Sequence, residues 1–146
     1  RDEPRRFVHV AAAVEHLVTE DAVRADAPAL RHLPHWALAK PSLALRLLEA
    51  RFGAHPLVTA YAVRVLRHAP WRTIMFYTPQ LVQALRNDRT GLVEQYLLDA
   101  CRRHELLAHQ VIWNTQTLTE PDDEGHLDAA LAAAAVGDVD SAAAAA

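Results

Sequence analysis

Apolar residues recur along most of this chain at the three- and four-residue spacing of a helix, and prolines or glycines separate the segments. The clearest case is residues 56–68, which begin with a proline and stop before Ala69-Pro70. Their apolar positions make one broad stripe, formed by Leu57, Val58, Tyr61, Ala62, Val65 and Leu66. A stripe of this width predicts a helix that packs among other helices.

The same spacing predicts further helical segments on both sides of that helix. They are residues 7–18, a short turn over 21–24, a segment that starts between 26 and 28 and closes near 34, 41–52, a short piece over 71–77, a helix that starts at 78 and carries Leu81, Val82 and Leu85, 91–104, and 105–118. Gly53 is expected to end the segment over 41–52, and residues 87–91 are predicted to form a turn.

Polar residues near the segment ends indicate local contacts. The Thr19 hydroxyl is expected to cap the short turn that follows it. Thr78 and Pro79 are predicted to be the N-cap and the first helical residue of the next long helix. Asp99 precedes Arg103 by four residues, an order that favours an ion pair along one helix.

A faint internal repeat connects two of these helices. Leu57-Val58-x-x-Tyr61 recurs as Leu92-Val93-x-x-Tyr96, and each copy follows a helix that begins with a proline, Pro41 or Pro79. A period of this size with two helices per unit is typical of stacked helical hairpins. We therefore predict an all-α fold, a superhelix of antiparallel hairpins like HEAT or armadillo repeats, without a sheet. So short an array is expected to lean on adjoining domains for stability.

Composition allows one globular domain and excludes several classes. The 146 residues are 51% apolar. The net charge is -3 and the positive residues are spread along the chain, which argues against nucleic-acid binding. One cysteine excludes a disulfide framework within the chain. We expect a cytosolic location because we find neither a signal peptide nor a membrane-spanning run. The chain starts without methionine, and we expect it to be an excerpt of a longer protein.

The C-terminal part differs in composition from the rest. Residues 121–125 are an acidic break, and the remainder is rich in alanine with few large apolar side chains. Such a segment cannot form a packed core. We therefore predict a helical domain over residues 1–120 and a low-complexity linker or tail over residues 121–146.

Nine histidines raise the question of a metal site. His32 and His35 could share one helical face, as could Glu105 and His109, but a zinc site needs three or four converging ligands. No ligand quartet at a recognised spacing is present, so we predict no metal ligands. His109 is instead expected to be a hydrogen-bonded core residue, and His55 to shape the turn before Pro56.

The sequence also contains no recognisable catalytic motif. Cys101 is expected to be a small buried hydrophobe, and Ser42 a residue at a helix start. Lys40 stands before Pro41 without the strand context of an ATP-contacting lysine, and the chain has no glycine-rich phosphate loop. The carboxylates of the acidic break, Asp122, Asp123 and Glu124, lack calcium-loop spacing. We predict no catalytic and no cofactor-binding residues in this chain.

Aromatic side chains could mark either a binding groove or the core. At helical spacing the core is the commoner place for them, and we predict that role for Trp36, Tyr61, Trp71, Tyr96 and Trp113.

Several stretches, taken in order, resemble the helical (accessory) domain of phosphoinositide lipid kinases, and most closely that of the type III alpha phosphatidylinositol 4-kinases. The stretches with the most information are residues 76–88 and 109–114. The others are Leu17-Val18-Thr19, Ala27-Pro28-Ala29-Leu30, Leu33-Pro34-His35-Trp36-Ala37, His55-Pro56-Leu57, Tyr61-Ala62-Val63-Arg64-Val65-Leu66, Gly91, Tyr96 and Leu107-Ala108-His109-Gln110. They cover about the first four fifths of the chain.

The resemblance implies a scaffold that packs against and positions a lipid kinase catalytic domain of the same polypeptide. The parent enzyme would use ATP and Mg²⁺, bound in that catalytic domain, to phosphorylate phosphatidylinositol at the 4-hydroxyl. It would be cytoplasmic and recruited peripherally to the plasma membrane, with scaffold proteins there as further partners. We expect no cofactor in this chain itself.

Two alternatives share parts of the same pattern. A free-standing HEAT-like adaptor for protein interactions would show the same periodicity without enzyme activity. A histidine-metal enzyme is the third reading. Coding sequence downstream of Ala146 would separate the first two, and elemental analysis would test the third.

Overall fold

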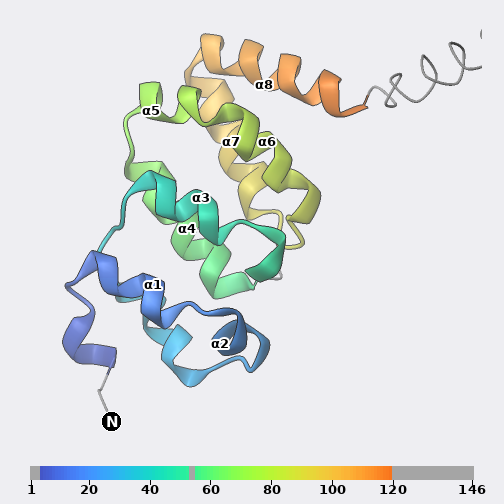
Figure 1. Ribbon diagram of the computed structural model, residues 1–146. Coiled ribbons are helices and arrows are strands. Elements are labelled where there is room, and N and C mark those ends of the chain that lie inside the picture. Colours follow the sequence, from blue (N-terminus) through green and yellow to red (C-terminus); the bar gives the residue numbers. More distant parts are fainter. Residues whose placement is uncertain (1–3, 53–54, 120–146) are drawn as a thin grey trace, which may run out of the picture. The chain divides into compact units, whose positions relative to one another are not determined.

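The computed structural model describes residues 4–52 and 55–119, and these residues form helices and connecting turns with no strand among them (Figure 1). Short 3-10 helices are labelled η. In chain order the elements are η1 (Pro4–Phe7), η2 (Ala11–Ala13), α1 (Val14–Leu17), α2 (Glu20–Arg24), η3 (Pro28–His35), α3 (Pro41–Leu47), η4 (Ala50–Phe52), α4 (Pro56–His68), α5 (Trp71–Phe76), α6 (Thr78–Ala84), η5 (Leu85–Asn87), α7 (Leu92–Arg103) and α8 (Glu105–Thr119).

Backbone contacts separate residues 1–115 from residues 116–146. Of the second unit the structure describes only the last residues of α8. The low-complexity segment predicted over residues 121–146 lies outside the described residues. The predicted boundary at residue 120 therefore stays a prediction.

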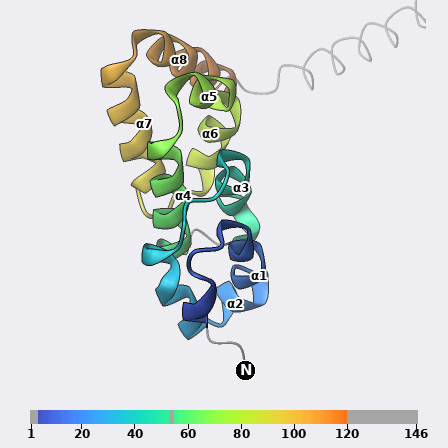
Figure 2. The same ribbon diagram turned by 90° about the vertical axis from the view of Figure 1, so that its left-hand side faces the viewer.

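The helix predicted from the strongest stripe, α4, has the bounds that the pattern indicated. Pro56 is its first residue, and the helix stops at His68 because Ala69 is extended ahead of Pro70. α4 contacts α3, η3 and α7. Figure 2 shows α4 between α3 and α7. The all-α, solenoid-like class predicted from the repeat is confirmed.

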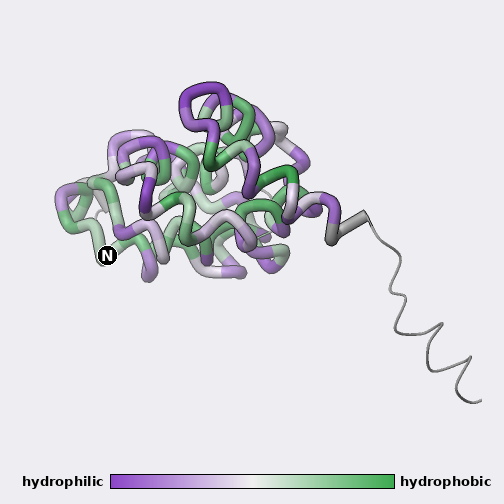
Figure 3. Tube along the Cα trace, turned by 90° about the horizontal axis from the view of Figure 1, so that it is seen from above, coloured by the Kyte–Doolittle hydropathy of each residue, from purple (hydrophilic) through white to green (hydrophobic). Residues whose placement is uncertain are grey.

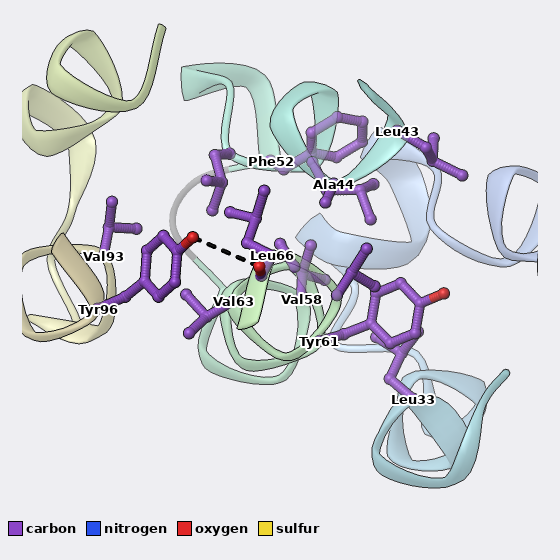
Figure 4. Packing of buried hydrophobic residues seen from close by; sticks show 14 of the residues in the cluster. Leu33, Leu43, Ala44, Phe52, Val58, Tyr61, Val63, Leu66, Val93 and Tyr96 are labelled. Carbon is purple, nitrogen blue, oxygen red and sulfur yellow. Dashed lines mark hydrogen bonds between the residues drawn. The ribbon is translucent and has the colours of Figure 1, made fainter. Parts of the chain in front are cut away.

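A single apolar cluster holds these helices together. Figure 4 shows its centre, where side chains of α4 meet those of η3, α3, η4 and α7. Hydrophilic and hydrophobic residues alternate along the helical part of the chain in Figure 3. Thr59 and Thr78 are the polar residues buried with the cluster among the described residues.

The two repeat tyrosines have corresponding roles in this cluster. Val58 and Val93 are buried, as are Tyr61 and Tyr96. The Tyr61 hydroxyl donates to the Ala37 carbonyl at 2.7 Å and accepts from the Ala39 N–H at 3.1 Å. The Tyr96 hydroxyl donates to the Leu66 carbonyl at 3.4 Å, the bond drawn in Figure 4.

Burial keeps both phenols protonated over the ordinary pH range. Desolvation raises the pKa of Tyr61, against the opposing hydrogen bond from Ala39 and the charge of Arg64. Desolvation likewise raises the pKa of Tyr96 to about 12, against the charge of Arg67. Each tyrosine therefore acts as a hydrogen-bond donor that fixes a neighbouring backbone segment.

Arg64 ties η3 to α4 through backbone carbonyls. Its guanidinium donates to the Leu33 oxygen at 3.2 Å and also contacts the oxygens of Pro34 and Trp36. These carbonyls lie at the C-terminal end of a helix, where intrahelical donors run out. The guanidinium also lies 5.2 Å from the Tyr61 ring centre.

The single helix predicted over residues 7–18 is wrong. The structure has η1, η2 and α1 there, with Val10 extended. The reason is tertiary, because the Val8 carbonyl accepts from the Ala37 N–H and the Val10 carbonyl from the Trp36 indole. The Val8 oxygen is thereby lost to a regular helical ladder, and the Val10 oxygen accepts from the Trp36 indole as well as from the Ala13 N–H.

Two other predicted helices differ from the structure at their ends. The segment over 41–52 is interrupted, because i→i+3 bonds at Leu48 and Glu49 tighten the end of α3 before η4 begins. The N-cap of α6 is Tyr77, so the role predicted for Thr78 is wrong. Thr78 is buried, and its hydroxyl donates to the Ile74 carbonyl at 3.3 Å. The Thr19 cap is confirmed, since its hydroxyl accepts from the Ala22 N–H.

Candidate functional site

The described residues contain no group of three or more His, Cys, Asp or Glu side chains that could hold a metal ion. His32 is half-buried and His35 is exposed on η3. The core role predicted for His109 is wrong, because its side chain is exposed and lies 3.8 Å from the Glu105 carboxylate on the same helix. Leu107 and Val111 face the cluster instead.

The other residues considered for metal binding or catalysis lie against the apolar cluster, at a helix start or in a turn. Cys101 is half-buried against the apolar cluster, and burial raises the pKa of its thiol, which lowers its reactivity. Lys40 is the N-cap of α3, and Ser42 is exposed in its first turn. His55 precedes α4 and lies 3.1 Å from Asp26, which joins two turns. The acidic residues at 122–124 lie outside the described part of the chain.

The core role predicted for the aromatic residues holds for three of them and fails for one. Trp36, Tyr61 and Tyr96 are buried. Trp71 is half-buried and stacks on His104, with ring centres 5.1 Å apart. Trp113 is 71% exposed, so the prediction for it is wrong.

Trp113 belongs to an exposed apolar surface on α8. Leu106 and Trp113 are separated by two helical turns and lie on one side of the helix, and Ile112 adds to the exposed surface beside Trp113. We call these three residues the α8 face. Phe76 at the end of α5 is 76% exposed, with its ring edge against Tyr77.

The opposite side of α8 is covered by the rest of the domain. Leu107 is fully buried, and the Thr78 hydroxyl of α6 lies 3.4 Å from the Gln110 side chain. Phe76 is two residues before Thr78 and therefore lies near the same junction. Since α8 has apolar residues on its covered and its exposed sides, it is suited to join this domain to another surface.

This face was missed at the sequence level, although a signal existed. Residues 105–118 carry apolar side chains around the whole helix rather than on one stripe. That distribution indicates a helix covered on two sides. Leu106, Ile112 and Phe76 were not singled out for it.

Asp88 positions the start of α7, the helix that precedes α8 in the chain. The Asp88 carboxylate accepts from the N–H groups of Val93 at 2.8 Å and Glu94 at 3.0 Å, and also from the backbone and hydroxyl of Thr90. Gly91 between them is left-handed, with φ of 70°, which glycine adopts without strain. The turn predicted over 87–91 is present over residues 88–91, because Asn87 is the last residue of η5, and the Asp88 carboxylate bonds to the first N–H groups of α7.

The ion pair predicted between Asp99 and Arg103 is wrong. The Asp99 carboxylate contacts Arg67 of α4 at 3.0 Å and Arg102 at 3.4 Å instead. Neither α8 nor any other helix in the described ranges has the length and apolar content needed to cross a bilayer.

The packed helices of the described residues define the class of all-α, solenoid-like domains. Comparison with known proteins makes the class specific. The chain belongs to the phosphoinositide 3-kinase family accessory domain (PIK domain), whose family model matches residues 8–132.

The curated proteins that match the chain are consistent with this family. The chain is 40% identical over 118 residues to phosphatidylinositol 4-kinase alpha 1 of Arabidopsis thaliana, covering 80% of this chain and 6% of the relative. It is 33% identical over 91 residues to phosphatidylinositol 4-kinase STT4 of Saccharomyces cerevisiae, covering 62% of this chain and 5% of the relative. The stt4 protein of Schizosaccharomyces pombe is 33% identical over 69 residues, covering 47% of this chain and 4% of the relative. No solved structure matches the chain significantly.

The resemblance drawn from the sequence is confirmed. This chain is a kinase-associated helical domain, and it spans only a small fraction of the length of the curated relatives that it matches.

Proposed function

We propose that the chain is the accessory domain of a phosphatidylinositol 4-kinase and that it packs against and positions a catalytic domain of the same polypeptide. The catalytic domain would bind ATP and Mg²⁺ and transfer the γ-phosphate to the 4-hydroxyl of phosphatidylinositol. The parent would be cytoplasmic and recruited peripherally to the plasma membrane by scaffold proteins. The names of the relatives support this reaction.

The observation that carries the positioning role is the α8 face. A tryptophan and two large aliphatic side chains exposed together on one helix are the kind of apolar surface that a neighbouring domain covers. Phe76 at the end of α5 is a further large apolar side chain that is exposed. Docking there would order the catalytic domain through rigid helix contacts rather than through a flexible linker.

The test is a double substitution, Leu106→Glu with Trp113→Glu, in the whole kinase polypeptide. Both side chains are exposed, so we expect the 146-residue chain with the same changes to unfold at the same denaturant concentration as the original. In the whole polypeptide we expect phosphatidylinositol 4-kinase activity to fall about tenfold, because charged groups would enter the interface. Radiolabelled phosphate transfer with identification of the 4-phosphorylated product measures the activity.

Leu98→Glu is the matched control, since Leu98 is an exposed leucine on α7 outside the α8 face. We expect it to leave activity unchanged. Full activity of the double variant would contradict the positioning role. A product phosphorylated at another hydroxyl would contradict the assigned reaction while leaving the positioning role intact.

A further inference from the structure

A second surface of the domain combines a hollow with unusual charge. The hollow lies where the ends of α4 and α7 meet the starts of α5 and α8, and its volume is about 70 Å³. Leu66, Ile74 and Leu107 supply buried apolar side chains to its lining. Trp71 and His104, stacked on one another, also line it. The hollow is separate from the α8 face.

Arginines predominate among the charged groups around this hollow. Arg67 and Arg103 line it, Arg102 reaches Asp99, and Arg72 lies 5.6 Å from the Trp71 ring centre. The acidic groups are Asp99, which lines the hollow, and Glu105, which lies 3.8 Å from His109. The surroundings therefore carry an excess of positive charge.

Favourable interaction with the helix dipole explains the position of only some of these arginines. Arg67, Arg102 and Arg103 are in the last turns of α4 and α7, where cations complement the helix dipole. Arg72 is in the first turn of α5, where the dipole has the same sign as the side chain. Arg103 is exposed and makes no ion pair or side-chain hydrogen bond with the described residues. These two guanidinium groups are therefore accessible to an outside anion.

The state of Asp99 reflects the same environment. Hydrogen bonds from Arg67 and Gln95 hold the pKa of its carboxyl below the ordinary value, with smaller contributions from the charges of Arg67 and Arg102. Asp99 stays ionised at neutral pH and engages two of the arginines. Arg72 and Arg103 are left as the contacts for a ligand.

The shape of the site selects among anionic ligands. A bilayer is a flat surface, and it would engage basic and apolar side chains that protrude together. Here the apolar side chains of the lining are buried and exposed arginines, Arg67 and Arg103, line the same hollow, a combination that suits one inserted side chain with carboxylates beside it. Charge complementarity and the recessed apolar lining together favour a peptide segment.

We propose that this hollow is a docking site for an acidic peptide segment that inserts one apolar side chain between Trp71 and Leu107 and places its carboxylates against Arg72 and Arg103. The inference does not depend on the reaction of the parent enzyme. It assigns the domain a second interaction surface, directed at a partner of opposite charge.

The test is a titration of the 146-residue chain into a fluorescein-labelled synthetic peptide in which glutamates and aspartates flank one leucine. Fluorescence anisotropy should show saturable binding that weakens as salt rises. Arg103→Glu should weaken binding about tenfold, because it turns an attraction into a repulsion at an exposed position. Asp99→Asn should tighten binding severalfold, since it releases Arg67 and Arg102 toward the ligand.

Three controls separate charge from shape. Ala100→Leu on α7 should weaken binding by filling the hollow without changing its charge. A peptide with alanine in place of its leucine should bind more weakly for the corresponding reason. Arg31→Glu, an exposed arginine of η3, should have no effect. Circular dichroism of each variant confirms that the helices are retained.

Failure to bind the peptide, or binding that Arg103→Glu leaves unchanged, would overturn the proposal. So would binding to phosphatidylcholine vesicles containing phosphatidylserine that requires Arg103, if the same chain ignores the peptide. Trp113→Glu alone, at a position outside the lining of the hollow, should bind the peptide normally. This result separates the hollow from the positioning role of the α8 face.

Discussion

Replacing Tyr61 with alanine is expected to lower the free energy of unfolding of the chain by about 4 kcal/mol. Tyr61 is 2% exposed and lies in the cluster where α4 meets η3 and α3. Alanine removes the ring, which leaves a cavity in a packed core. It also removes the hydroxyl that bonds to Ala37 and Ala39. Urea denaturation followed by circular dichroism measures the loss.

The contribution of the hydroxyl can be separated from that of the ring. We expect Tyr61→Phe to cost about 1–2 kcal/mol, because the Ala37 carbonyl and the Ala39 N–H both lose a partner. Tyr96→Phe is the matched control from the other copy of the repeat. Its bond to Leu66 is long, at 3.4 Å, and that carbonyl also accepts from the Ala69 N–H. We expect a loss below about 0.5 kcal/mol there. Equal losses would show that the Tyr61 hydroxyl does not hold residues 37–39.

Replacing Asp88 with alanine is expected to lower the free energy of unfolding by about 2 kcal/mol. Its carboxylate satisfies the Val93 and Glu94 N–H groups at the start of α7 and also bonds to Thr90. Alanine leaves these donors to water or to no partner. Asp21→Ala is the control, because its side chain is 92% exposed and pairs only with Arg24. We expect that change to cost about 0.3 kcal/mol.

The Asp88 effect should also depend on pH. Desolvation acts to raise the pKa of this carboxyl, but hydrogen bonds from Glu94, Thr90 and Val93 outweigh it and hold the pKa below the ordinary value. A depressed folded-state pKa adds stability above the unfolded pKa of about 3.9, and this stability is lost as pH falls through the folded-state value. The difference between the original chain and Asp88→Ala should therefore be constant near neutral pH and shrink in acid. A difference that grows below pH 4 would contradict this assignment.

How far the sequence could be interpreted depended on whether a contact was local. α4 could be located because its proline start, its wide stripe and the Ala69-Pro70 stop all act within one segment. The Thr19 cap and the turn at Gly91 were found for the same reason. Residues 7–18 carry a helical pattern too, but Trp36 and Ala37 take two of their carbonyls from a distance.

The candidate site shows the same difference between local contacts, which the sequence predicts, and distant ones, which it does not. Periodicity placed a helix over residues 105–118, and the structure has α8 there. It could not tell which side other helices cover, because α8 is apolar on more than one side. Trp113 and His109 were therefore assigned to the core, whereas Leu107 is the residue that is buried. The basic hollow was missed because the arginines that line it come from two helices, α4 and α7, that are distant in sequence.

By itself the sequence determined the all-α class, the long helices, the repeat and the accessory-domain family, because each is encoded in the order and spacing of neighbouring residues. Only the tertiary structure decided which apolar side chains stay exposed on α8, which carbonyls Arg64 engages, and how Arg67 and Arg103 come to line one hollow. Those features depend on pairs of residues about thirty or more positions apart, whose meeting follows from how whole helices pack.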